Sequence, residues 1–226
     1  MSVFTISGKE TSKSKEGVLL VAAAKMFSQK GYSATSIKDI TSEAGLSVGS
    51  FYSYFENKEA IVDKLYDSMT KLSFAMASSA AKGAPEGIAE QFTYALTSAI
   101  SVYVDNRELA QIILLKCMGI NDHLERRRRE TFDRTTKFLE RVLAHLVQDH
   151  DVVIDDEEVI AIAITHSVFG LVVHLIEGRN NDNLIDIVYP FCVYHLRGLR
   201  IKFSEGKVRQ VIAQALEIER RNKHAN

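Results

Sequence analysis

The stretch from Thr35 to Glu59 constrains the fold of this chain more than any other part of its sequence. Thr35 or Ser36 can cap a short helix, because a hydroxyl at that position accepts a hydrogen bond from a free backbone N–H. Gly45 is placed to end this helix in the left-handed conformation, which carries no Cβ penalty for glycine. Ser47 can cap a second helix after a turn of about three residues, so the stretch has the spacing of a helix-turn-helix.

The second helix of this pair, predicted from Val48 to Tyr54, has one apolar side and one polar side without charge. Val48, Phe51 and Phe55 recur at helical spacing and are expected to pack inward. Small and hydroxyl-bearing residues on the other side can approach a duplex closely and hydrogen-bond to base edges and phosphates. These residues are Gly49, Ser50, Tyr52, Ser53 and Tyr54.

Several segments of this region together resemble the DNA-binding domain of the tetracycline-repressor (TetR) family. The segments are Gly31-Tyr32, the run 35–40, the run 44–55 and Lys58-Glu59. The resemblance covers about residues 15 to 65 and implies a homodimer whose N-terminal helix-turn-helix reads a palindromic DNA operator. It also implies a larger helical C-terminal region that dimerises and encloses a small molecule. Beyond residue 65 the chain resembles the family only in its length and helical texture.

The resemblance further implies which residues meet DNA. Bases or adjacent phosphates are expected to contact Ser47, Gly49, Ser50 and Tyr52. The phosphate backbone is expected to contact Thr35, Ser36, Lys38, Tyr54 and Lys58.

The rest of the chain is also predicted to be helical, because 226 residues contain only two prolines and no hairpin signal. Helices are expected at 15–30, 57–82, 86–104, 106–119, 122–149, 156–178, 183–203 and 205–222. We therefore expect an all-α fold, with a three-helix helix-turn-helix DNA-binding domain in residues 1–60, of which 1–14 form a mobile arm. A helical ligand-binding and dimerisation domain is expected in residues 61–226. The net charge of −1 says little about DNA binding, because the local distribution of charge matters more than its sum.

The run from Val159 to Ile176 contains no charged residue and approaches the length that crosses a bilayer. Its histidines and Gly170 make it a poor membrane span, and a helix that is apolar all round is expected to be covered by protein. Together with the apolar helix near 183–203, it is expected to form a homodimer interface through the helices near 156–178 and 183–203. The alternative is that both helices close the core of a monomer.

A pocket for a small hydrophobic effector is expected between residues 86 and 176. An acyl chain, a flavonoid-like aromatic compound or a lipophilic drug would suit its apolar and aromatic residues. The candidate lining residues are Phe92, Leu96, Ile100, Tyr103, Ile113, Cys117, Phe138, Val142, His166, Phe169 and Val173. The same set would also describe a plain hydrophobic core.

Enzyme classes are disfavoured, because the sequence lacks a glycine-rich phosphate loop, a nucleophile elbow and a metal triad at workable spacing. No cofactor or metal is expected. Six of the seven histidines lie between His123 and His195, so a haem- or metal-binding sensor stays an alternative. A DNA-binding dimer without a small-molecule ligand is the other alternative. Cys117 and Cys192, in a chain with no recognisable signal peptide, favour a reducing cytoplasm.

The run Arg126-Arg127-Arg128-Arg129 occupies a full helical turn, so most of it is expected to be solvated. One or two of these arginines could pair with Glu125 and Glu130 or meet an anionic group of a ligand.

Overall fold

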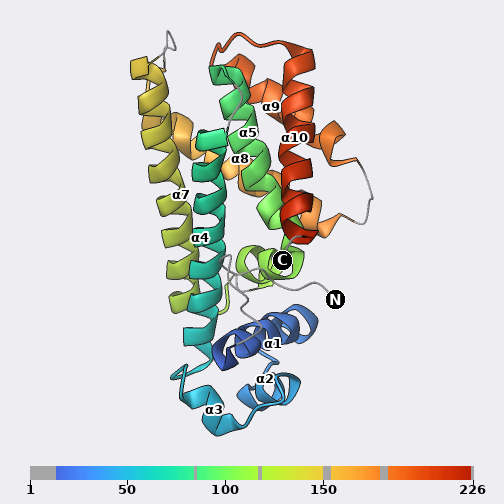
Figure 1. Cartoon of the computed structure of the whole chain (residues 1–226). Coiled ribbons are helices and arrows are strands. Elements are labelled where there is room, and N and C mark those ends of the chain that lie inside the picture. Colours follow the sequence, from blue (N-terminus) through green and yellow to red (C-terminus); the bar gives the residue numbers. More distant parts are fainter. Residues whose placement is uncertain (1–13, 84–85, 117–118, 150–153, 179–182, 225–226) are drawn as a thin grey trace. The chain divides into compact units, whose positions relative to one another are not determined.

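The computed structural model describes residues 14–83, 86–116, 119–149, 154–178 and 183–224, which are helical and contain no strand (Figure 1). The predicted all-α fold is confirmed. The α-helices are α1 (Lys15–Lys30), α2 (Ile37–Glu43), α3 (Val48–Tyr52), α4 (Lys58–Gly83), α5 (Ile88–Asp105), α6 (Arg107–Gln111), α7 (Asp122–Asp149), α8 (Glu157–Glu177), α9 (Leu184–Gly198) and α10 (Glu205–His224). A π-helix, η2 (Ile112–Lys116), follows α6 directly. The predicted N-terminal arm and Cys117 lie outside the described residues, apart from Ser14.

Contacts divide the chain into two compact units. The first unit contains Met1–Leu72 and Tyr103–Thr131, and the second contains Ser73–Val102 and Phe132–Asn226. Helices α4, α5 and α7 therefore contribute residues to both units. The predicted domain boundary after residue 60 falls in the first turn of α4, and this boundary stays a prediction.

The first unit is built around α1, which contacts α2, α3, α6 and η2. Ser14 caps α1 by accepting a hydrogen bond from Gly17 N at 3.0 Å, and the helix ends before Gly31. In Figure 1 the blue helices α1 to α3 form a compact group at the start of α4. Its core consists of fully buried apolar side chains from four helices, including Leu19, Phe27, Ile40, Phe51, Ile61 and Leu65.

The turn between α2 and α3 depends on Gly45, whose φ is 65°. In this left-handed conformation the Leu46 N–H donates to Thr41 O at 2.9 Å, and the Gly45 N–H donates to Ser42 O at 3.2 Å. These bonds satisfy carbonyls that the end of α2 leaves without helical partners. Ser47 then starts α3 by accepting from Ser50 N at 3.1 Å.

The second unit packs α5 against α10 through Tyr94, Val211 and Ala215. Ser167 of α8 lies 3.0 Å from His195 of α9, through Oγ and Nε2. By length and composition α8 could cross a membrane, although 33% of its most apolar window is buried. A single helix of this kind is weak evidence for a membrane span, because core helices of other proteins pass the same test of length and composition.

Three predicted helix limits were wrong. Helix α3 ends at Tyr52 instead of Tyr54, and the predicted helix 106–119 is a short α-helix followed by the π-helix. The helix predicted to reach residue 203 ends at Gly198. There Arg200 takes a positive φ of 56°, and Ile201 N donates back to Leu196 O at 2.9 Å, which closes the helix without a glycine.

We predict that Gly45→Ala lowers the free energy of unfolding by about 1 kcal/mol, because alanine is strained at positive φ. Gly49→Ala is the matched control: Gly49 is helical, and an added Cβ would meet only Ser47 Oγ, at 3.8 Å. This control should be neutral or stabilising, since alanine favours a helix over glycine by about 0.5–1 kcal/mol. Urea unfolding of both variants measures the difference, and an equal loss in the two would contradict the assigned turn.

Candidate nucleic-acid interface

The first helix of the helix-turn-helix, α2, begins with a capping box. Ser36 N donates to Asp39 Oδ2 at 2.8 Å, and Asp39 N donates to Ser36 Oγ at 3.1 Å. Lys30 pairs with Asp39 at 2.7 Å. Hydrogen bonds from Lys30 and then from Ser36 hold the pKa of the Asp39 carboxyl well below its usual range. Asp39 therefore stays charged at the N-terminus of α2, where a negative charge is favourable.

Helix α3 turns its aromatic residues to opposite sides. Phe51 is 0% exposed and Phe55 is 5% exposed, and their ring centroids lie 5.6 Å apart behind the helix. Tyr52 and Tyr54 are 57% and 47% exposed. The expectation that Val48 also packs inward was wrong, because Val48 lies on the exposed side at the start of α3. The hydroxyl-rich face of α3 is thus directed away from the interior of its unit.

The predicted DNA-contact residues divide by exposure. The exposed ones are Ser36, Lys38, Ser47, Gly49, Tyr52 and Tyr54, and the half-buried ones are Ser50 and Lys58. Ser47 and Ser50 share a hydrogen bond of 3.0 Å between their hydroxyls. The structure therefore brings eight of the nine predicted residues to the surface of the helix-turn-helix.

Thr35 is the exception, because it is buried. Its hydroxyl donates to the carbonyl of Gly31 at 2.7 Å and lies 3.2 Å from the carbonyl of Met26. The prediction of a phosphate contact by this side chain needs correction, since the hydroxyl is used within the protein. Thr35 instead ties the start of α2 to the end of α1.

Lys58 has a second role that sequence reasoning missed. Its Nζ donates to Tyr32 O at 2.7 Å and to Thr35 O at 2.8 Å, and it lies 4.2 Å from the centroid of the Tyr32 ring. Burial lowers the pKa of Lys58. The lysine thereby fixes the first turn of α4 to the connection between α1 and α2. Backbone carbonyls in a buried connection generally need hydrogen-bond donors, but this rule does not identify which lysine supplies them.

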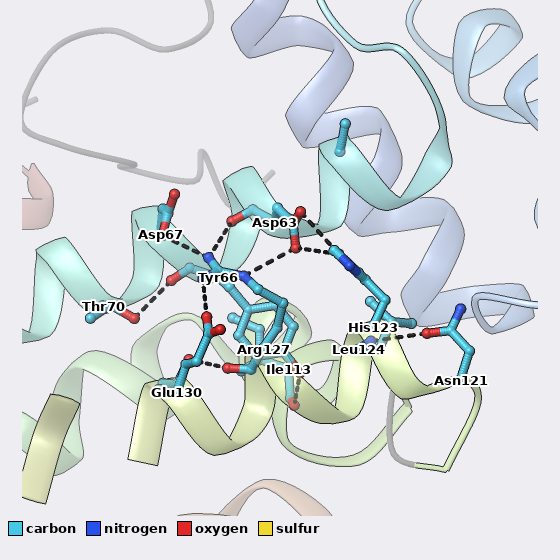
Figure 2. A network of polar contacts seen from close by, with 12 residues as sticks. Asp63, Tyr66, Asp67, Thr70, Ile113, Asn121, His123, Leu124, Arg127 and Glu130 are labelled. Carbon is cyan, nitrogen blue, oxygen red and sulfur yellow. Dashed lines mark hydrogen bonds and ion pairs between the residues drawn. The ribbon is translucent and has the colours of Figure 1, made fainter. Parts of the chain in front are cut away.

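A charged network connects α4 with the start of α7 inside the first unit, and it centres on Arg127 (Figure 2). The expectation that some of the four arginines pair with nearby acids is confirmed: Arg127 pairs with Glu130 at 2.9 Å and Arg128 with Glu125 at 3.0 Å. The sequence did not reveal the partners on α4. Asp63 and Asp67 lie 3.1 Å and 2.7 Å from nitrogens of the Arg127 guanidinium.

The predicted effector residues divide between the two units. Tyr103 and Ile113 belong to the first unit, where Tyr66 Oη donates to Ile113 O at 2.8 Å, and Cys117 lies outside the described residues. The second unit contains Phe92, Leu96, Ile100, Phe138, Val142, His166, Phe169 and Val173. These eight occupy α5, α7 and α8.

Two aromatic residues of this second group were missed. Phe132 stacks on Phe169 with a centroid distance of 4.2 Å and lies 5.2 Å from the His166 ring, and Phe74 lies 5.0 Å from Phe138. Phe132 lies within the predicted range 86–176, on the same helix as Phe138 and Val142, whereas Phe74 of α4 lies outside that range.

A groove of about 730 Å³ lies between α9 and α10 and is lined by none of the predicted effector residues. Among the described residues, no group of histidine, cysteine, aspartate and glutamate side chains could hold a metal ion. Burial raises the pKa of the Cys192 thiol to about 12, although its hydrogen bond with Thr97 acts the other way. A thiol with this pKa is a poor redox sensor, because the thiolate is the reactive form.

Known proteins resemble this chain in sequence at the helix-turn-helix and in fold over most of its length. A family model for bacterial regulatory proteins of the tetR family matches residues 19–65. The HTH-type transcriptional repressor KstR2 of Mycobacterium tuberculosis is 46% identical over 52 residues, which are 23% of this chain and 26% of KstR2. The chain thus aligns with much less than two thirds of that relative.

Two solved structures share the fold. The fatty acid degradation regulator FadR of Bacillus halodurans has a TM-score of 0.72 at 19% identity, covering 83% of this chain and 97% of FadR. FadR of Bacillus subtilis in complex with stearoyl-CoA has a TM-score of 0.66 at 20% identity, covering 80% and 96%. At these identities the likeness concerns the fold alone. The sequence match lies on the helix-turn-helix described above, and it identifies residues 19–65 as matching the model of the tetR family of bacterial regulatory proteins.

Proposed function

We propose that this protein is a transcriptional regulator that binds a palindromic operator as a homodimer and is released by a small hydrophobic effector. Repression is its proposed default action. The observation that carries the proposal is the outward polar face of α3, backed by the buried rings of Phe51 and Phe55. A surface that combines Gly49 with serine and tyrosine hydroxyls can lie close to base edges in the major groove. The repressor activity of KstR2, which shares this segment, supports the same function.

Individual residues take different parts in the proposed DNA contact. Ser47, Ser50 and Tyr52 read bases or adjacent phosphates, and Gly49 permits close approach. Lys38, Tyr54 and Ser36 contact the backbone from the exposed surface. Lys58 still has one N–H beyond its two carbonyl bonds, so it can donate to a phosphate while it anchors α4.

Selection from random-sequence duplex DNA should therefore recover an inverted repeat, with half-sites about one helical turn (34–36 Å) or a multiple of it apart. Lys38→Ala should weaken binding to that operator and to other sequences about equally. It should also lower the slope of log affinity against log salt concentration by about 1, as expected for one phosphate contact. Ser50→Ala should instead change which bases are preferred. Fluorescence anisotropy across a salt series measures both effects. Selected DNA without an inverted repeat would count against a dimer that reads a palindrome. An unchanged salt dependence for Lys38→Ala would count against its phosphate contact.

Dimerisation is proposed to involve α8 and α9, the helices in which an apolar interface was expected. On α8, Val159 and Ile162 are 56% and 42% exposed, and Tyr194 of α9 is 72% exposed. Large exposed apolar side chains that follow a helix are typical of surfaces covered by a partner. Gly170 leaves open space where a Cβ would stand, which permits close helix approach on the exposed side of α8.

Ile162→Asp should convert the protein from a dimer to a monomer of 25.3 kDa, because a carboxylate would be buried without a partner. Gln210→Asp, at an exposed position of α10, is the control and should leave the mass unchanged. Sedimentation equilibrium measures the mass of each variant. A wild-type protein that sediments as a monomer would refute the proposed interface and with it two-fold reading of DNA.

The proposed effector is a long-chain acyl group, bound in the second unit. Phe132, Phe138 and Phe169 offer apolar aromatic surface there. The hydroxyls of Thr93 and Thr165 are buried and find no hydrogen-bond partner among the described residues, so a polar ligand group could satisfy them. The complex of Bacillus subtilis FadR with stearoyl-CoA, in a protein of the same fold, supports the acyl class.

Stearoyl-CoA should therefore release the selected operator, whereas coenzyme A without the acyl chain should not. Phe169→Ala should weaken this release about ten- to hundredfold, since a buried phenylalanine contributes about 1.5–3 kcal/mol. Anisotropy of labelled operator, titrated with each compound, measures the release. If neither acyl-CoA nor free fatty acids of several lengths displace DNA or bind the protein, a regulator without a small-molecule ligand becomes the better description.

A further inference from the structure

One arginine uses all three guanidinium nitrogens in the network between α4 and α7 (Figure 2). Nη2 of Arg127 donates to Asp67 Oδ1 at 2.7 Å and lies 3.4 Å from the carbonyl of Asp63, and Nη1 donates to Glu130 Oε2 at 2.9 Å. Nε lies 3.1 Å from Asp63 Oδ1, at ion-pair distance but without the alignment of a hydrogen bond. Arg127 is thus the one residue that joins three carboxylates in this network.

Two of the three carboxylates belong to α4. Asp63 and Asp67 are four residues apart and share one face of the helix, so Arg127 holds two successive turns at once. We call Asp63, Asp67, Arg127 and Glu130 the Arg127 clamp. Glu130 differs from the other acids because it lies on α7 itself, three residues after Arg127.

Further contacts fix the same side of α4 within the first unit. His123 Nε2 lies 3.0 Å from both carboxylate oxygens of Asp63, and Asn121 donates to Glu59 Oε1 at 2.8 Å. These bonds place the first three turns of α4 against the beginning of α7. The start of α4 is in turn bonded through Lys58 to the connection that precedes α2.

The arginine of the clamp is screened from water more than the other lysines and arginines of the unit that form ion pairs. The Arg127 side chain is 15% exposed, whereas Lys25 and Lys30, which also form ion pairs, are 45% and 47% exposed. Charged hydrogen bonds in a desolvated site are stronger and more directional than exposed ones. Removing one partner leaves the remaining charges uncompensated, so the helices must shift or admit water.

We propose that Arg127 is a positioning residue for DNA recognition, because its grip on Asp63 and Asp67 sets the direction of α4 and thereby the separation of the two recognition helices. This inference rests on the proposed function as a DNA-binding homodimer. It assigns to one member of the arginine run a role in operator spacing, without any contact to DNA.

Asp67→Asn and Glu130→Gln form a matched pair of variants that tests the proposal. Each removes the charge of one carboxylate bonded to Arg127, and both acids are partly exposed, at 42% and 52%, so both variants should fold. Of these two acids, only Asp67 connects Arg127 to α4. Affinity is measured for the operator selected with the wild-type protein and for versions with the half-sites moved one base pair closer or farther apart.

Asp67→Asn should weaken binding to the selected operator about tenfold, which is a typical coupling between linked sites. The affinity for each operator with altered spacing should change by less than about threefold. The preference for one spacing is thereby reduced. Glu130→Gln should leave all three affinities within about twofold of the wild type, since it removes no link to α4. Arg127→Met should weaken binding to the selected operator more than Asp67→Asn does, and it should reduce the preference for one spacing further. Equal behaviour of Asp67→Asn and Glu130→Gln, or equal losses on all three operators, would overturn the proposal.

Hydrogen exchange of the DNA-free variants separates this proposal from the proposed function. Asp67→Asn should speed amide exchange in residues 58–72, and Glu130→Gln should not. If the wild type binds no duplex, the proposed function fails, and the operator-spacing role of Arg127 fails with it. Faster exchange in Asp67→Asn would then still identify the clamp as the contact that orders α4, whereas unchanged exchange would refute the clamp as well.

Discussion

Charged hydrogen bonds to the first turns of α4 are the interaction on which the first unit depends. Lys58 of α4 donates to the carbonyls of Tyr32 and Thr35. Arg127 of α7 donates to the carboxylate of Asp67 and forms an ion pair with Asp63. Both cations are partly withdrawn from water, which makes such bonds stronger than those of exposed pairs. Helix α4 is therefore fixed on the side of the helix-turn-helix and on the side of α7 by directional bonds.

Helix α3, the proposed recognition helix, needs tertiary support, because five residues cannot form a stable helix alone. Its conformation is imposed by the Ser47 cap, by the left-handed turn at Gly45 and by burial of Phe51. The exposed residues of α3 add no burial to the unit and can serve recognition. Stability and the proposed DNA recognition thus depend on opposite sides of one short helix.

Helix α7 contributes residues both to the proposed effector site and to the Arg127 clamp. Arg127 lies in the part of α7 that belongs to the first unit, and Phe132 lies in the part that belongs to the second, where it stacks on Phe169. A ligand that displaced the Phe132 ring would act on the same helix that holds α4. Such a ligand would change DNA affinity only if it bound more tightly to a conformation with a different affinity for DNA.

The sequence by itself determined the helices, most limits of the long ones and the outward face of α3. Caps, glycines and apolar spacing act within one or two turns, so they predicted α1 and α7 to the residue and α10 to within two. Tertiary structure alone decided that Thr35 is buried, that Val48 is exposed and that Tyr103 and Ile113 belong to a different compact unit from the other described candidates for the effector site. It also selected Arg127 from four equivalent arginines, because desolvation and ion pairing there depend on a helix 60 residues away, which no local pattern records.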